Sequence, residues 1–141
     1  MDFKRDGNRL LVRLHTGEEI MQIVQQFAQE QKIKNAAVIG IGAAENLDLG
    51  YWDREKREYA RRQFADPHEL LSLSGNLSWR DGSPFLHAHV LLANRDFAVT
   101  GGHLFAATIT ATAELQIWPG ELELRREMDE SVGMKLWDLC G

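Results

Sequence analysis

Three of the five histidines lie in one short stretch of the sequence, where their imidazoles could form a metal chelate. His87 and His89 are two residues apart, so on a β-strand both side chains project from the same face. The turn-forming residues Asn94-Arg95-Asp96 lie between two apolar runs, which predicts a hairpin whose second arm carries His103 back toward the first. The stretch 85–105 is therefore the expected site of chemistry.

The register of this hairpin decides whether the third histidine joins the pair. With a three-residue loop at 94–96, His103 lies opposite His87 and the three rings share a face. With a two-residue loop, His103 points to the other face, and a bulge at Gly101-Gly102 could also re-aim it. Both arrangements are open from the sequence alone.

Three neutral imidazoles with an open fourth position suit zinc, and they also suit iron, nickel or copper. The expected cofactor is therefore Zn²⁺ or another divalent transition metal on His87, His89 and His103. A small-molecule ligand could bind at such a metal. The alternative is that the histidines pack at a subunit boundary, where their protonation would alter assembly without any metal.

A catalytic role would need a group that carries protons near the metal. If the metal polarises a carbonyl or activates water, Glu69 and Glu114 are the candidate proton carriers. The competing interpretation of Glu114 is an exposed polar residue of an alternating strand. Glu69 follows Pro67-His68, where a turn or hydrogen-bonding role competes equally.

Length and composition predict one globular domain over residues 1–141. The chain has 141 residues, of which 44% are hydrophobic and 26% charged, enough to bury its own core. The first residues are charged where a secretory signal would be apolar, and no apolar run approaches membrane-spanning length. The single cysteine, Cys140, excludes an internal disulfide. We expect a cytoplasmic protein without a membrane partner.

The net charge of −5 argues against a surface built broadly to neutralise phosphates. Three small basic clusters occur, at 54–57, at Arg61-Arg62 and at Arg125-Arg126, and acidic residues are interleaved with the first and third. Such clusters are typical of solvated faces. A local patch in an oligomer remains an alternative.

The periodicities predict an α+β fold of mostly antiparallel sheet, a sandwich or barrel, with one main amphipathic helix at about residues 17–31. Thr16 and Glu19 have the spacing of a capping box at the start of that helix. Its expected buried stripe is Ile20, Ile23, Val24, Phe27 and Ala28.

Alternation of apolar and polar residues predicts about eight strands. The expected strands include 9–14, 35–43, 47–52, 70–79, 107–117 and a charged edge strand at 121–125. Gly40-Ile41-Gly42 lies where a dinucleotide-binding loop could form, but Glu45 occupies the third glycine position and a strand pattern follows. These glycines favour a bend or a close backbone approach instead.

Four motifs together resemble a known family: Glu69 to Ser78, Pro84-Phe-Leu-His-Ala-His89, Gly101-Gly-His-Leu104 and Thr112-Ala-Glu114. In order and spacing they are similar to the plants and prokaryotes conserved (PPC) domain, from the first strand to about Arg125. The resemblance implies a compact α+β fold that assembles as a homotrimer. The paired histidines of the family correspond to His87 and His89, and its glycine-glycine-histidine corresponds to His103.

The resemblance also implies a link to DNA. In plant nuclear relatives this domain is joined to AT-hook segments that bind DNA, and stand-alone bacterial members are commonly described, provisionally, as DNA-binding proteins. No Arg-Gly-Arg-Pro core occurs in this sequence, so the element that touches the minor groove is absent. The sequence thus predicts a small trimeric regulatory protein, associated with DNA or DNA-bound proteins, that carries a three-histidine metal site. The alternative is a metal-dependent enzyme or small-molecule-binding protein acting at His87, His89 and His103.

Overall fold

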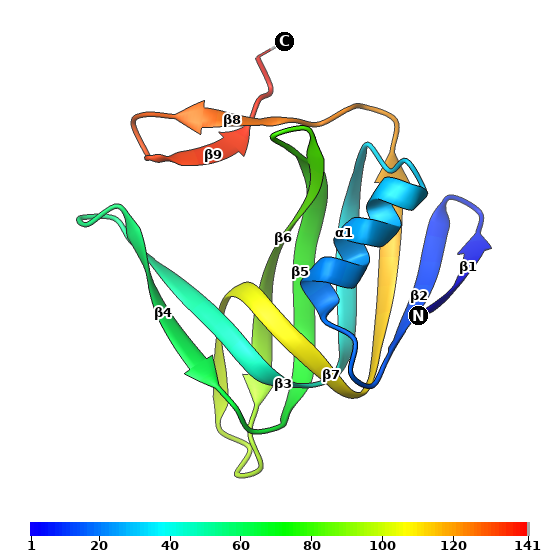
Figure 1. The fold of residues 1–141 in the computed structure, drawn as a ribbon, viewed down its shortest axis with the longest axis vertical. Coiled ribbons are helices and arrows are strands. Elements are labelled where there is room, and N and C mark those ends of the chain that lie inside the picture. Colours follow the sequence, from blue (N-terminus) through cyan, green and yellow to red (C-terminus); the bar gives the residue numbers. More distant parts are fainter. Residues whose placement is uncertain (141) are drawn as a thin grey trace.

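The computed structural model describes residues 1–140, and over that range it contains one helix and nine strands (Figure 1). The elements follow the chain in this order: β1 Asp2–Asp6, β2 Arg9–His15, α1 Ile20–Glu30, β3 Asn35–Asp53, β4 Glu58–Phe64, β5 His68–Arg80, β6 Ser83–Ala93, β7 Val99–Gly120, β8 Arg126–Asp129 and β9 Met134–Trp137. The predicted α+β class, with one helix and mostly antiparallel sheet, is confirmed. Among residues 1–140, no helix combines the length and the apolar character needed to cross a membrane.

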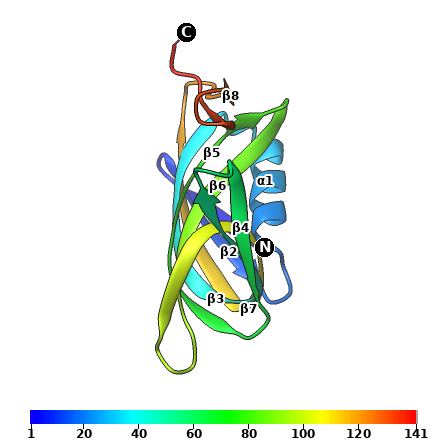
Figure 2. The ribbon, with the colours of Figure 1, turned by 90° about the vertical axis from the view of Figure 1, so that its left-hand side faces the viewer.

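One antiparallel sheet of seven strands forms the body of the molecule, in the order β1-β2-β7-β6-β5-β3-β4. The long strand β7 also pairs with β3, so that β3, β5, β6 and β7 form a closed ring of pairings. Figures 1 and 2 show the strong bending of β3 and β7 that this closure requires and α1 packed against the sheet. The architecture is therefore barrel-like, which is one of the two arrangements, sandwich or barrel, that the sequence predicted.

The helix starts three residues later than the capping-box pattern predicts, and Glu19 itself is the N-cap. Its carboxylate accepts hydrogen bonds from the backbone amides of Met21 and Gln22. Thr16 is not part of the cap, because its hydroxyl donates to carbonyls of β7 instead. The buried stripe is confirmed at Ile20, Val24, Phe27 and Ala28, while Ile23 is half-buried.

The two strands predicted at 35–43 and 47–52 form one continuous strand, β3. Its pairing register shifts against β5 between Gly40 and Gly42, and against β7 at three points between Gly42 and Leu49, so the strand bends without ending. A side chain at Gly40 or Gly42 would collide with β7. The expected bend and close backbone approach are both confirmed, and the bend lets one strand pair along both halves of β7.

The C-terminal segment differs from the prediction. Residues 121–125 are not a strand: β7 continues to Gly120, and a short hairpin of β8 and β9 follows. The pattern misled because Leu122 and Leu124 alternate with glutamates, yet Leu122 is exposed and only Leu124 is buried. In Figure 1 the hairpin lies across the end of the molecule, beside the ends of β5 and β6. That position makes it a wall of the site described next.

Candidate metal centre

The hairpin of β6 and β7 places the histidines, with a register two residues away from the expected one. Its loop spans residues 94–98 rather than 94–96, and His89, not His87, pairs directly with His103. The Asn94 side chain holds this wider loop by accepting hydrogen bonds from the amides of Asp96 and Ala98. A shift of two residues preserves the face to which each side chain points. Of the two arrangements that the sequence left open, the structure therefore has the one in which all three histidines share a face.

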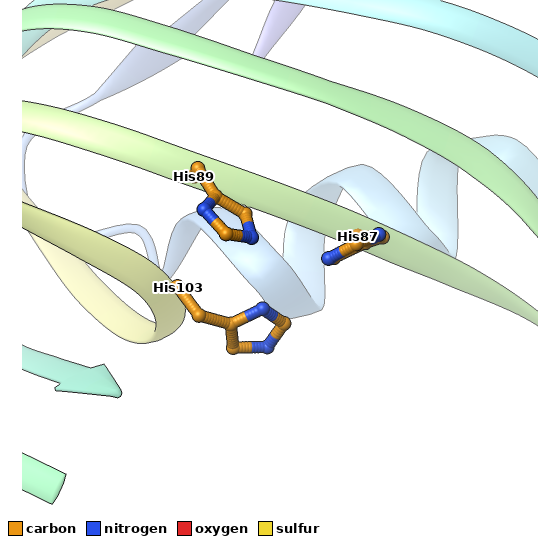
Figure 3. Close-up of side chains that lie close together, drawn as sticks. All are labelled: His87, His89 and His103. Atoms are coloured by element: carbon orange, nitrogen blue, oxygen red, sulfur yellow. The ribbon is translucent and has the colours of Figure 1, made fainter. Parts of the chain in front are cut away.

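The three imidazoles form a compact triangle. Ring centroids lie 5.2 Å apart for His87 and His89, 5.1 Å for His87 and His103, and 5.4 Å for His89 and His103. One nitrogen atom of each ring lies within 4.8 Å of those of the other two. Figure 3 shows a nitrogen of each ring directed toward the space among them.

His103 is the most deeply placed of the three, with 7% of its surface exposed. Its ring packs against the rings of Tyr59 and Phe105, at centroid distances of 4.9 and 4.7 Å, and these two rings also contact each other at 5.0 Å. Its Nδ1 atom is buried and has no hydrogen-bond partner. Burial, and then the neighbouring His87 and His89, lower the pKa of His103 to about 4, so the ring is neutral at pH 7.

Gly50 of β3 makes this packing possible. It pairs directly with His103 on one side and with Arg61 on the other. A Cβ atom at Gly50 would lie 2.5 Å from the Phe105 ring and 2.8 Å from that of Tyr59. The missing side chain therefore leaves room for the two aromatic rings that pack against His103.

His87 has a charged neighbour that sequence reasoning missed. Nη2 of Arg126 lies 3.2 Å from Nδ1 of His87. Burial, followed by the charge of Arg126, lowers the pKa of His87 to about 4. The Arg125-Arg126 pair was expected to lie on a solvated face, and this holds only for Arg125. Arg125 is exposed, whereas Arg126 is buried, with 8% of its surface exposed. One feature of the sequence could have indicated that Arg126 is buried. It lies two positions after the apolar Leu124, and residues two apart in an extended segment point to the same side.

A cavity of about 540 Å³ opens beside His87 and His103. One part of its wall is apolar, from Phe85, Leu104 and Phe105, and the C-terminal hairpin contributes Arg126 and Lys135 among others. The site thus combines three imidazoles, of which only that of His103 is buried, with an adjacent cavity that has a basic side.

The two candidate proton carriers do not join the histidines. Glu69 and Glu114 are both exposed, and neither belongs to the cluster of ligand atoms. Glu114 lines a different hollow of the sheet, together with Ile39 and Ile41. The exposed-residue interpretation of Glu114 fits this position.

The donor set fits a transition metal. Three neutral imidazoles are a common ligand set for zinc. The buried Nδ1 of His103, which has no hydrogen-bond partner, is available to serve as one of these ligands. In a tetrahedral zinc site the ligand nitrogens are about 3.4 Å apart. The present limit of 4.8 Å requires the rings to draw closer on binding. His89 is exposed on the outer side, so it has room to move.

Comparison with known proteins gives a consistent picture of the fold. A family model described as the Plants and Prokaryotes Conserved (PCC) domain matches residues 1–121. Among curated proteins, none matches the sequence.

Three solved structures resemble the chain over nearly its whole length. A metal-containing protein from Archaeoglobus fulgidus is 38% identical, with a TM-score of 0.86 and coverage of 97% of this chain and 98% of its own. A plant- and prokaryote-conserved protein from Pyrococcus horikoshii is 32% identical, with a TM-score of 0.87 and coverage of 99% and 95%. A protein from Bacteroides thetaiotaomicron, provisionally described as DNA-binding, is 25% identical, with a TM-score of 0.93 and coverage of 97% and 96%.

Proposed function

Because the chain belongs to the Plants and Prokaryotes Conserved domain family, we propose that it is a metal-binding protein of that family. One divalent transition metal, with zinc as the first candidate, would be held by His87, His89 and His103. The observation that carries the proposal is the buried Nδ1 of His103, which has no hydrogen-bond donor and lies in reach of two further imidazoles. The description of the Archaeoglobus relative as metal-containing supports it.

The low pKa of two of the ligands favours the same function. A metal needs neutral imidazoles, and the burial of His87 and His103 keeps both rings neutral well below pH 7. A metal bound here would supply Lewis acidity toward an oxygen atom of a ligand. The chain itself supplies an adjacent cavity of about 540 Å³ whose wall includes Arg126.

The test is elemental analysis of untagged protein purified without added metal. We expect about one metal per chain, and none in the His87→Ala/His89→Ala/His103→Ala variant. His68→Ala is the matched control, because His68 is equally buried but its Nδ1 is already bonded to the Asp66 carbonyl at 2.8 Å. Equal metal content in the triple variant and the wild type would contradict the proposal.

Catalysis at this metal is an alternative that the arrangement supports less. No carboxylate belongs to the histidine cluster within residues 1–140, and Glu69 and Glu114 lie outside it. We therefore favour binding of a small molecule over acid–base chemistry as the use of the site.

A second candidate function is regulation through DNA or DNA-bound proteins. The provisional description of the Bacteroides protein as DNA-binding supports it. The charges of this chain limit it, because Arg61 is paired with Asp48, and Arg57 donates to the carbonyls of Glu130 and Ser131. We expect at most weak duplex binding that declines steeply with salt, measured by fluorescence anisotropy. Tight, salt-insensitive and sequence-specific binding would instead favour the DNA function.

For the whole chain we propose one cytoplasmic domain that assembles as a homotrimer. An apolar groove of about 870 Å³ on the sheet supports self-association. It exposes Ile39 by 45% and Ile41 by 58%, with Phe3 and Leu11 beside them. Exposed apolar area of this kind is typical of a protein interface.

A further inference from the structure

We propose that the cavity beside the histidines binds a small carboxylic acid with an apolar body, and that the carboxylate and the metal bind cooperatively through Arg126. The carboxylate would lie between the metal and the guanidinium, and the apolar body would fill the cavity. This inference rests on the metal site proposed above and names the ligand class of that site.

The first observation is a buried arginine without an acidic partner. Arg126 is 8% exposed, and no carboxylate of residues 1–140 forms an ion pair with it. Its hydrogen-bond partners are all neutral: Ser78 Oγ at 2.8 Å, Asn76 Oδ1 at 3.0 Å, the Lys135 carbonyl at 3.1 Å and His87 Nδ1 at 3.2 Å. Four of the five N–H groups are thus used, and the charge is not balanced.

The second observation is the contact between Arg126 and a metal ligand. A guanidinium can only donate, so His87 Nδ1 must accept the hydrogen bond. A neutral imidazole has a single acceptor nitrogen, and a metal takes that lone pair whichever nitrogen it binds. Metal binding therefore ends the hydrogen bond from Arg126 to His87. A second N–H of the buried guanidinium then needs an acceptor, and two free N–H groups are what a carboxylate engages in a bidentate pair.

The third observation is the excess of positive charge around the cavity. Arg80, Arg126 and Lys135 line it, against one carboxylate, Asp81, which is paired with Lys135. Three neutral imidazoles leave the charge of a divalent metal uncompensated as well. The loaded site therefore favours an anion over a neutral ligand.

The remaining wall of the cavity selects the body of the ligand. Aromatic and aliphatic side chains line it, including Phe85, Phe105, Leu104 and Leu136. The Arg80 guanidinium lies 3.8 Å from the centre of the Phe85 ring, so the basic and the aromatic parts of the wall adjoin each other. A volume of about 540 Å³ accommodates a small molecule of a ring and a short chain.

The test is calorimetric titration of 3-phenylpropionate into zinc-loaded and into chelator-stripped protein, in a buffer free of carboxylates. We expect the zinc-loaded form to bind at least about tenfold more tightly, and the neutral analogue 3-phenylpropanol to show no such gain. Arg126→Gln should retain zinc and lose the gain. Arg125→Gln is the matched control, since Arg125 is exposed and pairs with Glu123 at 2.6 Å.

Reciprocal binding on the wild type keeps the test independent of how Arg126→Gln folds. Saturating 3-phenylpropionate should raise the zinc affinity by the same factor by which zinc raises the affinity for the carboxylate. Zinc uptake without carboxylate binding, equal binding to both forms, or unchanged binding by a zinc-loaded Arg126→Gln variant would overturn the anion site alone. A wild-type protein that takes up no zinc would overturn the metal site and this inference with it.

Discussion

The sheet carries two hollows of contrasting composition, the apolar groove and the cavity beside the histidines. The apolar groove exposes side chains that water solvates poorly, whereas beside the histidine cavity one buried polar atom, His103 Nδ1, has no hydrogen-bond partner. A row of directly paired residues joins them across the sheet: Leu11, Gln116, Ile39, Ser74, His89 and His103. The free-energy cost of exposed apolar area is removed when a large partner surface covers it, whereas the cost of a buried nitrogen without a partner is removed when a single atom binds it. From this difference we propose that the groove serves assembly and that the cavity serves ligand binding.

Of the substitutions that test this comparison, removal of a proposed metal ligand should have the largest effect, and the effect should be on zinc affinity. In His103→Leu we expect the zinc affinity to fall more than about 100-fold, because even residues that only support metal ligands change affinity by 10- to 100-fold. The zinc-free form should gain about 1 kcal/mol in unfolding free energy, since a buried unpartnered nitrogen is removed. Chelator competition and urea denaturation measure the two effects.

His68→Leu provides the contrasting result for the same prediction. His68 and His103 are both 7% exposed, but the His68 ring bonds the Asp66 carbonyl. We expect this variant to keep its zinc and to lose about 1 kcal/mol of stability. If His103→Leu binds zinc as tightly as the wild type does, His103 is not a metal ligand.

Acid should affect the cavity and leave the groove unchanged. His87 and His103 have a pKa of about 4 in the folded chain and about 6.5 when unfolded. Between these values the unfolded chain binds more protons, so stability is complete above pH 6.5 and falls as the pH drops toward 4. For zinc-free protein we expect a loss of about 2 kcal/mol per imidazole between pH 8 and pH 5, measured by urea denaturation.

The pH effect has an internal control. His87→Leu/His103→Leu should flatten the slope of stability against pH in this range, because it removes both groups with lowered pKa values. An equally steep slope in that variant would place the acid sensitivity elsewhere in the molecule.

Charge in the groove should disperse the assembly without affecting zinc. In Ile39→Asp/Ile41→Asp we expect self-association to weaken at least about tenfold, since two carboxylates would enter an apolar contact. Light scattering at several concentrations measures the change, and zinc content per chain should stay constant. Leu122→Asp is the control, because Leu122 is 66% exposed outside the groove. Equal assembly of both variants would assign the subunit contact to another surface.

The sequence was most informative where a local pattern decides the structure. Strand parity is local, so the shared face of His87 and His89 was predicted. His103 joins them because the loop 94–98 has an odd number of residues, which is one of the two arrangements that the sequence left open. The helix stripe was predicted because its periodicity is local as well. The cap was not, because Thr16 and Glu19 both have capping chemistry and the choice depends on the carbonyls of β7 that receive the Thr16 hydroxyl.

Features made by contacts between distant segments escaped the sequence. Arg126 is separated by 39 residues from His87, and nothing in the local pattern around either one indicates their contact. The joining of two predicted strands into β3 depends equally on β7, whose pairing continues past the glycine bend. The candidate metal ligands could thus be named from their spacing, whereas the charged wall that would select a ligand could not.

The smallest effect should follow from neutralising Glu114, which tests whether the two hollows are separate in chemistry as well as in composition. Glu114→Gln should leave zinc affinity within about twofold and stability within about 0.5 kcal/mol, because an exposed carboxylate far from a bound metal contributes little to either. Chelator competition measures the first and urea denaturation the second. Since Glu114 lines the groove, a neighbouring copy could still carry this carboxylate toward another chain. Combining Glu114→Gln with Ile39→Asp/Ile41→Asp separates an effect within one chain from an effect between chains. If Glu114→Gln changes the zinc affinity only when the chains can associate, Glu114 acts on a neighbouring chain. A tenfold change in zinc affinity that persists in the combined variant would make Glu114 a partner of the metal within its own chain.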